Sequence, residues 1–397
     1  MNQISLLRYL FAGTFFFFGL LVTFPVLSQD SQPLPTNKPT DIPQEKKLGQ
    51  ELFKETISCI LGKIPNPAKA NQGALQSASM QCVFRVAVIA KDGSVRPDAS
   101  DRMTALIKAL GINVPKPVSK GQANIALKKV PESKVFSVAV KLGTQTKNFL
   151  FDTGASASIV DSQIAKKLGL QATPIASDIL QYTVVGNDCS KIQANFHPLP
   201  GLTVNTATVN GLNGLGLPQT SIPGKLSGVL GLDFLSNFDM RVNPSKLQLE
   251  LLPPSPDISG AIPIKGKLGN VIAEVKVNGK GPFNFLLDTG ADTMVISSNL
   301  AKKLGIDSNK AEKTQVTGFC GLENARKIKL SQVSVQQHQV NQLDGVILES
   351  NNIFNILGID GIIGQNFLNK YQQHWRFGKR DELGYVESGS LVLTPIK

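Results

Sequence analysis

Two aspartic acids each follow directly after an apolar stretch of the sequence. Asp152 comes after Phe-Leu-Phe at residues 149–151, and Asp288 comes after Phe-Leu-Leu at residues 285–287. Burying a carboxylate in such surroundings is unfavourable unless other groups stabilise its charge. If folding brings the two carboxyl groups within hydrogen-bonding distance, they share one proton, because two neighbouring negative charges repel each other. Such a pair can take a proton from water and donate one to the group that the water attacks.

The surroundings of the two aspartic acids are repeated. Thr-Gly-Ala follows each of them, and a short apolar pair leads into similar helical patterns at residues 161–170 and 297–306. These copies lie 136 residues apart. Further on, Gly-Val-Leu-Gly-Leu-Asp-Phe-Leu at residues 228–235 matches Gly-Ile-Ile-Gly-Gln-Asn-Phe-Leu at residues 361–368, 133 residues apart. The repeat is therefore the size of a domain.

With these motifs the sequence resembles the retropepsin-like aspartic proteases. The resemblance rests on Asp-Thr-Gly-Ala in each copy and on the later pairs of hydrophobic residues followed by Gly, at residues 229–231 and 362–364. It covers residues 131–397 and is closest in kind to bacterial members that fuse two retropepsin-like units in one chain. The resemblance implies that Asp152 and Asp288 form one catalytic pair around an approximate two-fold axis.

The expected fold is mainly β. The resemblance implies a bilobal pepsin/retropepsin-like acid protease fold from two tandem units, plus a small N-terminal α/β accessory region. Many short apolar runs separated by Gly, Pro and Asn turns agree with this fold class. The clearest hairpin joins residues 271–277 to residues 283–287, because the Asn-Gly pair at residues 278–279 strongly favours a tight turn.

Four residues beside the aspartic acids are predicted to support the pair. Gly154 and Gly290 allow the backbone to turn tightly beside each carboxylate and to offer an N–H without a side-chain clash. The resemblance implies that Thr153 and Thr289 interlock beneath the pair. The resemblance also implies that Gly231 and Gly364, which end the two later apolar motifs, allow close packing behind the site.

The residues after the two motifs depart from the pepsin-like pattern. Ala155 and Ala291 stand where pepsin-like enzymes have Ser or Thr, whose hydroxyl stabilises the charged carboxylate. Losing that donor raises the carboxylate pKa, so we expect a less acidic optimum than that of gastric enzymes. Ser156 in the first copy corresponds to Asp292 in the second, so the halves of the cleft should differ. By resemblance Asp292 contacts the substrate backbone; the alternative is a surface acid.

Four cysteines are present, an even number that favours disulfides in an exported protein. Cys59 pairs most simply with Cys82, since both lie in the accessory region. Cys189 and Cys320 lie just beyond Gly186 and Gly318, where the resemblance places the mobile flaps that bind substrate. These two cysteines either bond across the two-fold axis or remain free thiols, and the sequence leaves both alternatives open.

The N-terminal third of the chain carries export and accessory signals. The first 28 residues hold one Arg, no acid and a long apolar run, which indicates a signal peptide; the alternative is an uncleaved membrane anchor. The protein is then periplasmic or secreted, or else N-terminally anchored. The predicted parts are a signal peptide (1–28), a Pro-rich linker (29–43), an accessory region (44–120), unit 1 (131–255) and unit 2 (258–397).

Within the accessory region, periodicity predicts a helix over residues 44–60, a strand over residues 83–90 and a helix over residues 101–110 with Ser100 as its cap. The region contains no catalytic constellation. It is interpreted as a packing or targeting module. The sharper hypothesis is an inhibitory prosegment that lays a basic residue against the catalytic carboxylates.

The charge and the histidine spacing argue against nucleic-acid binding and against a metal site. The net charge is +12, but the basic residues are scattered as Lys pairs on helices without aromatic residues between them, so nucleic-acid binding is not expected. The three histidines share no metal-ligand spacing, and neither a metal nor another cofactor is expected. The sequence therefore predicts an exported aspartic endopeptidase that acts on peptides or proteins as a monomeric pseudo-dimer. The rival is a catalytically inert, retropepsin-like peptide-binding or assembly module.

Overall fold

The computed structural model describes residues 44–396, with gaps at residues 95, 97, 110–115, 181–183, 185, 187–188, 257–259, 351 and 382. The chain divides into two compact units, Met1–Pro115 and Lys116–Lys397, which are described separately below. The predicted signal peptide and linker lie outside the described residues. Within the part of the chain that is described, every helix is too short or too polar to cross a bilayer.

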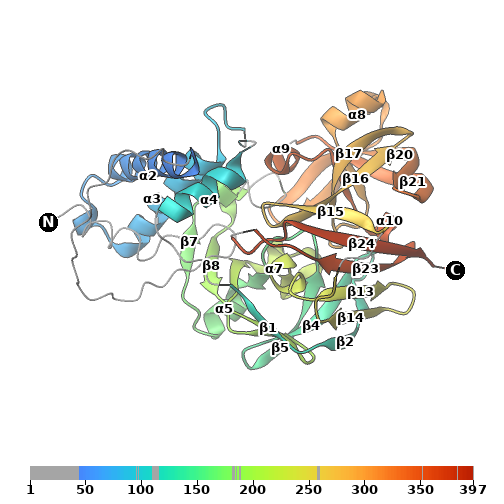
Figure 1. Cartoon of the computed structure of the whole chain (residues 1–397), viewed down its shortest axis with the longest axis horizontal. Helices are drawn as coiled ribbons and strands as arrows, with labels where there is room; N and C mark the ends of the chain where they lie inside the picture. The colour runs from blue at the N-terminus through green and yellow to red at the C-terminus, as the bar shows by residue number, and fades with distance from the viewer. Residues whose placement is uncertain are drawn as a thin grey trace. The chain divides into compact units, whose positions relative to one another are not determined.

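The described part of the N-terminal unit is mainly helical (Figure 1). Its elements are α2 (Gln44–Lys63), η1 (Pro67–Lys69), α3 (Gln72–Val83), η2 (Phe84–Val88) and α4 (Ala99–Ala109). The predicted helix over residues 44–60 is present as α2, with Leu52 and Ile60 on its buried face. The predicted disulfide between Cys59 and Cys82 is also present and joins α2 to α3. This covalent link supports a unit too small for a large apolar core.

Two local predictions for this unit are wrong. The predicted strand over residues 83–90 is instead the end of α3 followed by the π-helix η2. Its buried side chains are Val83, Phe84, Ala87 and Val88. They recur at helical spacing, and a short apolar run does not by itself distinguish a strand from a buried helix. Helix α4 begins at Ala99, so Ser100 lies inside it rather than at its cap. Residues 44–109 are thus mainly helical rather than α/β.

The second unit is built from strands. Among the described residues, its first sheet has 11 strands in the order β1-β10-β9-β4-β5-β12-β6-β11-β8-β7, with β3 beside β4. The bounds are β1 (Val118–Lys120), β3 (Lys128–Lys129), β4 (Phe136–Leu142), β5 (Gln145–Phe151), β6 (Ile159–Asp161), β7 (Thr173–Ile175), β8 (Ala194–Pro198), β9 (Leu202–Val204), β10 (Ala207–Asn210), β11 (Asn213–Leu217) and β12 (Gly228–Leu230).

The second sheet contains 13 strands within the described residues, in the order β19-β20-β21-β18-β22-β17-β16-β15-β24-β23-β13-β14-β2. Their bounds are β2 (Ala123–Ala126), β13 (Asp239–Asn243), β14 (Gln248–Leu252), β15 (Ile262–Lys267), β16 (Asn270–Val277), β17 (Lys280–Leu287), β18 (Met294–Ser297), β19 (Lys313–Gly318), β20 (Gly321–Val335), β21 (His338–Leu348), β22 (Gly361–Ile363), β23 (Tyr371–Phe377) and β24 (Ser388–Pro395). The predicted hairpin at the Asn-Gly turn is present as β16 and β17.

The two repeats have the same strand plan. From β5, which leads into Asp152, the first sheet continues through β12, β6, β11 and β8 to β7. From β17, which leads into Asp288, the second continues through β22, β18, β21 and β20 to β19. In each repeat the Asp strand pairs in parallel with the apolar strand of the later motif, β12 or β22. The sequence repeat is therefore a structural repeat, and the mainly β, two-lobed fold predicted from the sequence is confirmed.

Short helices follow the strands of each repeat. They are α5 (Ser162–Lys167), α6 (Ser177–Leu180), η3 (Cys189–Lys191), η4 (Gln219–Ser221), η5 (Pro223–Lys225), α7 (Leu232–Leu235), α8 (Ser298–Leu304), η6 (Ser308–Lys310), α9 (Asn352–Leu357) and α10 (Gln365–Leu368). Side-chain oxygens of Asp161 and Ser297 accept from backbone N–H groups at the starts of α5 and α8. The two helices predicted by the repeated pattern are these two.

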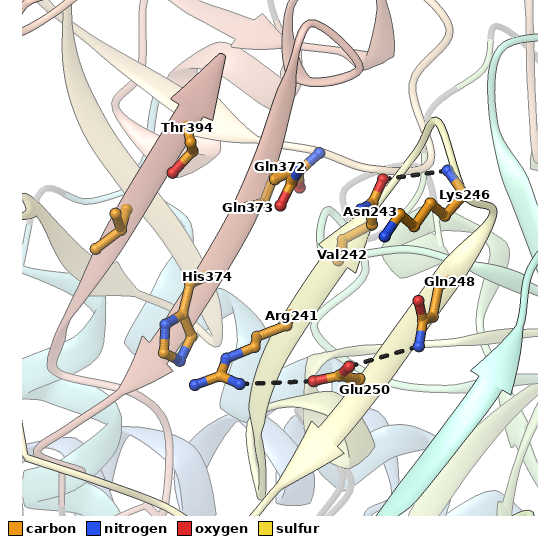
Figure 2. Close-up of a pocket in the computed structure, with 11 residues that line it drawn as sticks. Arg241, Val242, Asn243, Lys246, Gln248, Glu250, Gln372, Gln373, His374 and Thr394 are labelled. Atoms are coloured by element: carbon orange, nitrogen blue, oxygen red, sulfur yellow. Dashed lines mark hydrogen bonds and ion pairs between the residues drawn. The ribbon is translucent and has the colours of Figure 1, made fainter. Parts of the chain in front are cut away.

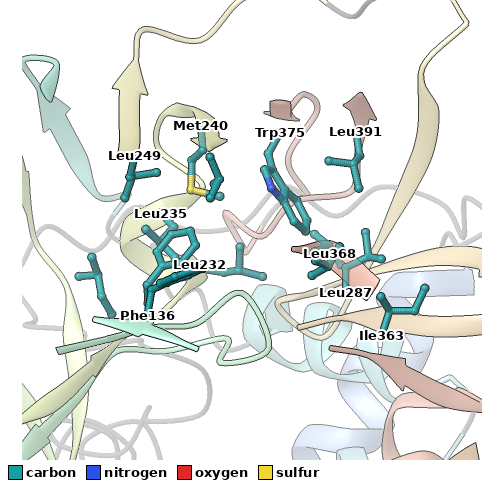
Figure 3. Close-up of a cluster of buried hydrophobic side chains, with 14 of the residues drawn as sticks. Phe136, Leu232, Leu235, Met240, Leu249, Leu287, Ile363, Leu368, Trp375 and Leu391 are labelled. Carbon is teal, nitrogen blue, oxygen red and sulfur yellow. The ribbon is translucent and has the colours of Figure 1, made fainter. Parts of the chain in front are cut away.

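Strands from both repeats share one sheet and one core. β13 and β14 of the first repeat pair with each other, and β13 also pairs with β23 of the second repeat. Figure 3 shows Phe136 and Leu232 in the same buried cluster as Leu287, Ile363 and Trp375. Trp375 is the only tryptophan of the chain and is fully buried. The continuous core holds the two repeats together, so the pair of aspartic acids between them is fixed.

Candidate active site

The two aspartic acids stand at the ends of buried strands. Asp152 follows β5, and its backbone N–H donates to the carbonyl of Leu230 at 3.2 Å. Asp288 follows β17, and its N–H donates to the carbonyl of Ile363 at 3.0 Å. Both bonds continue the pairing with the strand of the later motif. The apolar runs that precede the two aspartic acids are therefore buried strands that hold the two carboxyl groups in place.

The threonines interlock across the two repeats. The backbone N–H of Thr153 donates to Oγ1 of Thr289 at 2.9 Å, and the N–H of Thr289 donates to Oγ1 of Thr153 at 3.1 Å. Each hydroxyl in turn donates to a carbonyl of the other repeat, that of Leu287 at 2.7 Å or that of Phe151 at 3.0 Å. Both threonines are fully buried. Four reciprocal bonds in a water-excluded place fix the distance between the motifs.

Each glycine lies against the carboxyl group of the opposite repeat. The N–H groups of Gly154 and Ala155 donate to Oδ1 of Asp152 at 2.7 and 3.1 Å. A Cβ on Gly154 would lie 2.4 Å from Cγ of Asp288, and one on Gly290 would lie 2.4 Å from Cγ of Asp152. The equivalent N–H groups in the second repeat donate to Asp288 at 2.7 and 3.0 Å. Only glycine leaves room for the two carboxyl groups to meet.

Burial raises the pKa of both carboxyl groups, and each also affects the titration of the other. Asp152 is only 6% exposed. Burial raises its pKa, while the hydrogen bond from Asp288 and those from the backbone lower it. For Asp288, burial, the charge of Asp152 and the hydrogen bond to Asp152 all hold the pKa well above its usual range. Burial and the repulsion between the two charges therefore favour one proton shared by the pair.

A second layer of polar residues, which the sequence analysis did not single out, supports the motifs. In the first repeat, Asp233 accepts from the N–H of Ser158 at 2.9 Å and from its hydroxyl at 2.6 Å. In the second repeat the corresponding Asn366 donates to Oγ1 of Thr293 at 3.0 Å. Gln365 is fully buried and donates to the carbonyl of Thr289 at 2.9 Å. In the sequence, these polar residues could have been noticed because they directly follow the Gly of the second motif in each repeat, within an otherwise apolar segment.

Asp233 should make the stability of the second unit depend on pH. Burial raises its pKa from 3.8 to about 6, so the folded unit binds a proton that the unfolded chain releases. The charged Asp233 lowers the unfolding free energy of the wild type by about 3 kcal/mol above about pH 6, and this loss is absent below about pH 4. The amide in Asp233→Asn does not titrate, so the unfolding free energy of this variant minus that of the wild type should increase by about 3 kcal/mol from about pH 4 to about pH 6. Urea unfolding followed by Trp375 fluorescence measures this difference.

Asp344→Asn, at a side chain 77% exposed, is the control for this prediction. A difference between Asp233→Asn and wild type that does not change with pH would contradict the prediction.

The structure places Asp292 at the contact between the repeats. One of its carboxylate oxygens accepts from the backbone N–H of Lys134 at 2.6 Å, and the amide of Asn369 donates to the carbonyl of Lys134 at 2.9 Å. Ser156, the counterpart of Asp292, lies beside Gly269. The two positions therefore have different neighbours, while the difference between the two halves of the cleft stays a prediction. Contact between Asp292 and substrate stays a prediction.

The predicted flap position Gly186 and the cysteine beyond the other flap position, Cys320, lie together. Cys189 and Cys320 form a disulfide with their Cα atoms 4.8 Å apart, which settles the alternative left open by the sequence. Gly186 lies against Cys320, because a Cβ on Gly186 would be 2.7 Å from the Cα atom of Cys320. Gly318 ends β19 and pairs with Gly321, so Cys320 lies in the turn of the β19–β20 hairpin. Their role in substrate binding stays a prediction.

A separate concavity of about 380 Å³ lies on β13, β14, β23 and β24 and contains none of the predicted site residues (Figure 2). Its rim is polar, with Arg241 paired to Glu250 at 3.7 Å and His374 beside them. Within the described residues, no group of three His, Cys, Asp or Glu side chains is arranged to hold a metal ion.

Family models of known proteins match both repeats of this chain. Residues 136–234 match the model of an aspartyl protease family, and residues 273–370 match the model of the gag-polyprotein aspartyl proteases. Among solved structures, a retropepsin-like aspartic protease from Rickettsia conorii is similar over 34% of this chain and 89% of its own, with 21% identity and a TM-score of 0.26. No protein with a curated description matches. The two family matches, one over each repeat, show that the chain belongs to the retropepsin-like aspartic proteases and carries two tandem units.

Proposed function

We propose that this protein is an exported aspartic endopeptidase in which Asp152 and Asp288 together activate water. The observation that supports this most directly is the position of the two carboxyl groups: each lies against the glycine of the opposite motif and accepts two backbone N–H groups of its own motif. Burial and the neighbouring charge favour a single proton on the pair, and acid–base catalysis by two carboxyl groups requires this state. Both motifs and their supporting threonines and glycines are intact, which favours an enzyme over an inert module.

The proposed reaction uses the two carboxyl groups as base and acid. Asp152, as the charged member, takes a proton from a water molecule held between the two groups, and the oxygen of that water attacks the scissile carbonyl carbon. Asp288 donates its proton to the carbonyl oxygen, which becomes a hydroxyl of the tetrahedral intermediate. When the intermediate collapses, Asp152 passes its proton to the amide nitrogen, Asp288 takes a proton back from one hydroxyl, and the C–N bond breaks to give a carboxylic acid and an amine. No covalent bond to the protein forms at any step.

An extended peptide is the proposed substrate. It would lie between the aspartic acids and the flap positions at Gly186 and Gly318 and pair with the flap backbone as an added strand. The second oxygen of Asp292 is the proposed contact to the substrate backbone. Cleavage inside a chain, rather than at its end, follows from a site that both lobes flank.

Export is proposed from the cysteines and the N-terminal segment together. All four cysteines form disulfides, Cys59 with Cys82 and Cys189 with Cys320. Disulfides form and persist in oxidising compartments such as the periplasm or the extracellular space. The apolar first 28 residues supply the proposed signal, with the uncleaved anchor as the alternative.

Cleavage of a mixed peptide library by the full mature chain tests the proposal. Wild type should cut internal bonds from about pH 4 upward, pepstatin should block this activity, and Asp152→Asn should lower it by at least about 1,000-fold. Asp344→Asn makes the same chemical change at an exposed carboxylate and should retain activity. Cleavage that survives Asp152→Asn would contradict the proposed mechanism. Library peptides that bind without being cut would favour the inert binding module instead.

A further inference from the structure

The residue that follows the later Gly motif differs between the two repeats. Gln365 begins α10, and its backbone N–H donates to the carbonyl of Ala291 at 2.8 Å. Leu232 begins α7, and its backbone N–H donates to the carbonyl of Ala155, also at 2.8 Å. Both side chains are buried, with 0% and 2% of their surface exposed. The two positions are therefore equivalent in the fold, but the second repeat places an amide where the first has an apolar side chain.

Packing alone does not explain the amide of Gln365. Leu232 fills the equivalent place without polar atoms, whereas Oε1 of Gln365 is buried with no hydrogen-bond partner in the described part of the chain. A buried polar atom without a partner lowers stability. What the amide contributes is the bond from its Nε2, which donates to the carbonyl of Thr289 at 2.9 Å. A residue that breaks a packing rule in this way is expected at a functional site.

The bond from Gln365 reaches Asp288 through a single peptide group. The carbonyl of Thr289 and the N–H of Gly290 belong to the same planar peptide unit. That N–H donates to Oδ1 of Asp288 at 2.7 Å. A hydrogen bond accepted by the carbonyl polarises the peptide and strengthens the bond that its N–H donates. Gln365 therefore acts on the carboxyl group through this peptide.

The first repeat does not have this support. The N–H of Gly154 donates to Oδ1 of Asp152 at 2.7 Å, so the backbone bond itself is the same in both repeats. A leucine side chain has no polar atom, and Leu232 therefore cannot donate to the carbonyl of Thr153. The amide thus makes the two halves of the pair chemically different although their backbones are alike.

The charged groups near Asp288 act in the opposite direction. Among the described residues, the charge of Asp152 raises the pKa of Asp288, and burial raises it further. Behind Asp288, β22 is apolar and α10 adds the neutral Asn366. Asp292 follows in the same motif, and in the first repeat the corresponding helix carries the buried acid Asp233. The backbone N–H groups are what lower the pKa of Asp288, so a change in their strength should be measurable.

We propose that Gln365 is a positioning residue that holds and polarises the peptide between Thr289 and Gly290, and so stabilises the charged form of Asp288. Where it concerns catalysis, the inference rests on the proposed peptidase function. In that reaction Asp288 gives its proton to the carbonyl oxygen and takes one back when the intermediate collapses. The stability of its charged form therefore affects the acid step, and the amide adjusts this stability in one half of the pair only.

Gln365→Leu tests the proposal, because it gives the second repeat the residue that the first repeat has. In the pH profile of kcat/KM, the alkaline limb marks the loss of the last proton from the pair. This limb should move up by about 0.5 pH unit, because Asp288 holds its proton more tightly without the amide. The acid limb should stay in place. Gln365→Met removes the same donor with an unbranched side chain and should give the same shift, which decides the question if Leu does not fit. A folded variant with both limbs unchanged would overturn the proposal.

Gln373→Leu is the matched control. Gln373 is also buried, and its Nε2 donates to the carbonyl of Leu368 at 3.1 Å. The N–H of that peptide, which belongs to Asn369, donates to a backbone carbonyl instead of a carboxyl group. Both limbs should therefore stay in place in this variant. Asp233 titrates in the wild type and in every variant, so its effect cancels in the comparison. An equal shift of the alkaline limb in Gln373→Leu would overturn the proposal.

A titration without substrate separates this inference from the proposed function. NMR of isotope-labelled aspartate carboxyl groups follows Asp288 directly, and its signal is identified by its loss in Asp288→Asn. The signal should titrate at a higher pH in Gln365→Leu than in the wild type, and an unchanged titration would overturn this inference. Failure of the wild type to cut any peptide would overturn the proposed function, while the titration would still decide the role of Gln365. A shift of the acid limb instead of the alkaline limb would support the action of Gln365 and overturn the assignment of Asp288 as the proton donor.

Discussion

Replacing Asp288 by Asn should lower kcat/KM by about 10⁴-fold on any peptide that the wild type cuts. The amide of Asn cannot release a proton to the carbonyl oxygen, and the substitution removes the carboxyl group that shares a proton with Asp152. The fold should survive, because Asn can still accept the backbone N–H groups that reach Asp288 at 2.7 and 3.0 Å. Asp344→Asn is the matched control. Substantial activity in Asp288→Asn would contradict the assignment of the proton donor.

The same pair determines the pH dependence of wild type. Activity needs one proton on the pair, so the acid limb follows the lower of its two pKa values and the alkaline limb follows the higher. Burial raises the pKa of Asp152 above 3.8 and that of Asp288 well above it. The acid limb is therefore expected above about pH 4 and the maximum at a less acidic pH than in gastric enzymes. Values of kcat/KM measured from about pH 3 to about pH 8 check this. A maximum near pH 2 would contradict it.

Adding one methyl group at Gly154 should inactivate the enzyme without unfolding it. The new Cβ would lie 2.4 Å from Cγ of Asp288 and 2.5 and 2.6 Å from its oxygens, so that carboxyl group must move. A displacement of about 1 Å at a reacting group lowers the rate by about 100-fold. Gly290→Ala should act in the same way on Asp152, because the contact is reciprocal.

Gly62→Ala is the control for these two substitutions. Gly62 lies in α2 with nothing within 4 Å of its added Cβ, and alanine there should stabilise the helix by up to about 1 kcal/mol. Peptide cleavage and circular dichroism, measured on all three variants, separate loss of geometry from loss of fold. Wild-type activity in Gly154→Ala would show that the two carboxyl groups do not need this close approach.

Several features of the site and fold were predictable because they depend on short stretches of sequence. The Asp-Thr-Gly-Ala motifs and the later Gly motifs repeat with nearly constant spacing, so they identified the two units and the aspartic acids at 152 and 288. The Asn-Gly hairpin also depends on local turn chemistry and is present as β16 and β17. Cys59 and Cys82 have no other cysteine near them in the sequence, and their bond is present.

Other features depend on contacts between distant residues, which local patterns do not specify. The apolar run at residues 83–90 suits either a strand or a buried helix, and packing within its unit selected the helix. Asp292 meets Lys134, and Asp233 meets Ser158, only after the strands have paired. No residue near these acids in the sequence indicates its partner.

The sequence alone therefore indicated the chemistry proposed for this protein: which two carboxyl groups would act, which glycines and threonines stand beside them, and that one chain holds both halves. Only the tertiary structure decided how those groups are restrained. It placed each Gly against the opposite Asp, raised the pKa of both aspartic acids through burial, and joined Cys189 to Cys320 across the two repeats. The physical reason is that residue type and spacing specify local chemistry, whereas distance, burial and cross-links between repeats arise only when the sheets pack together.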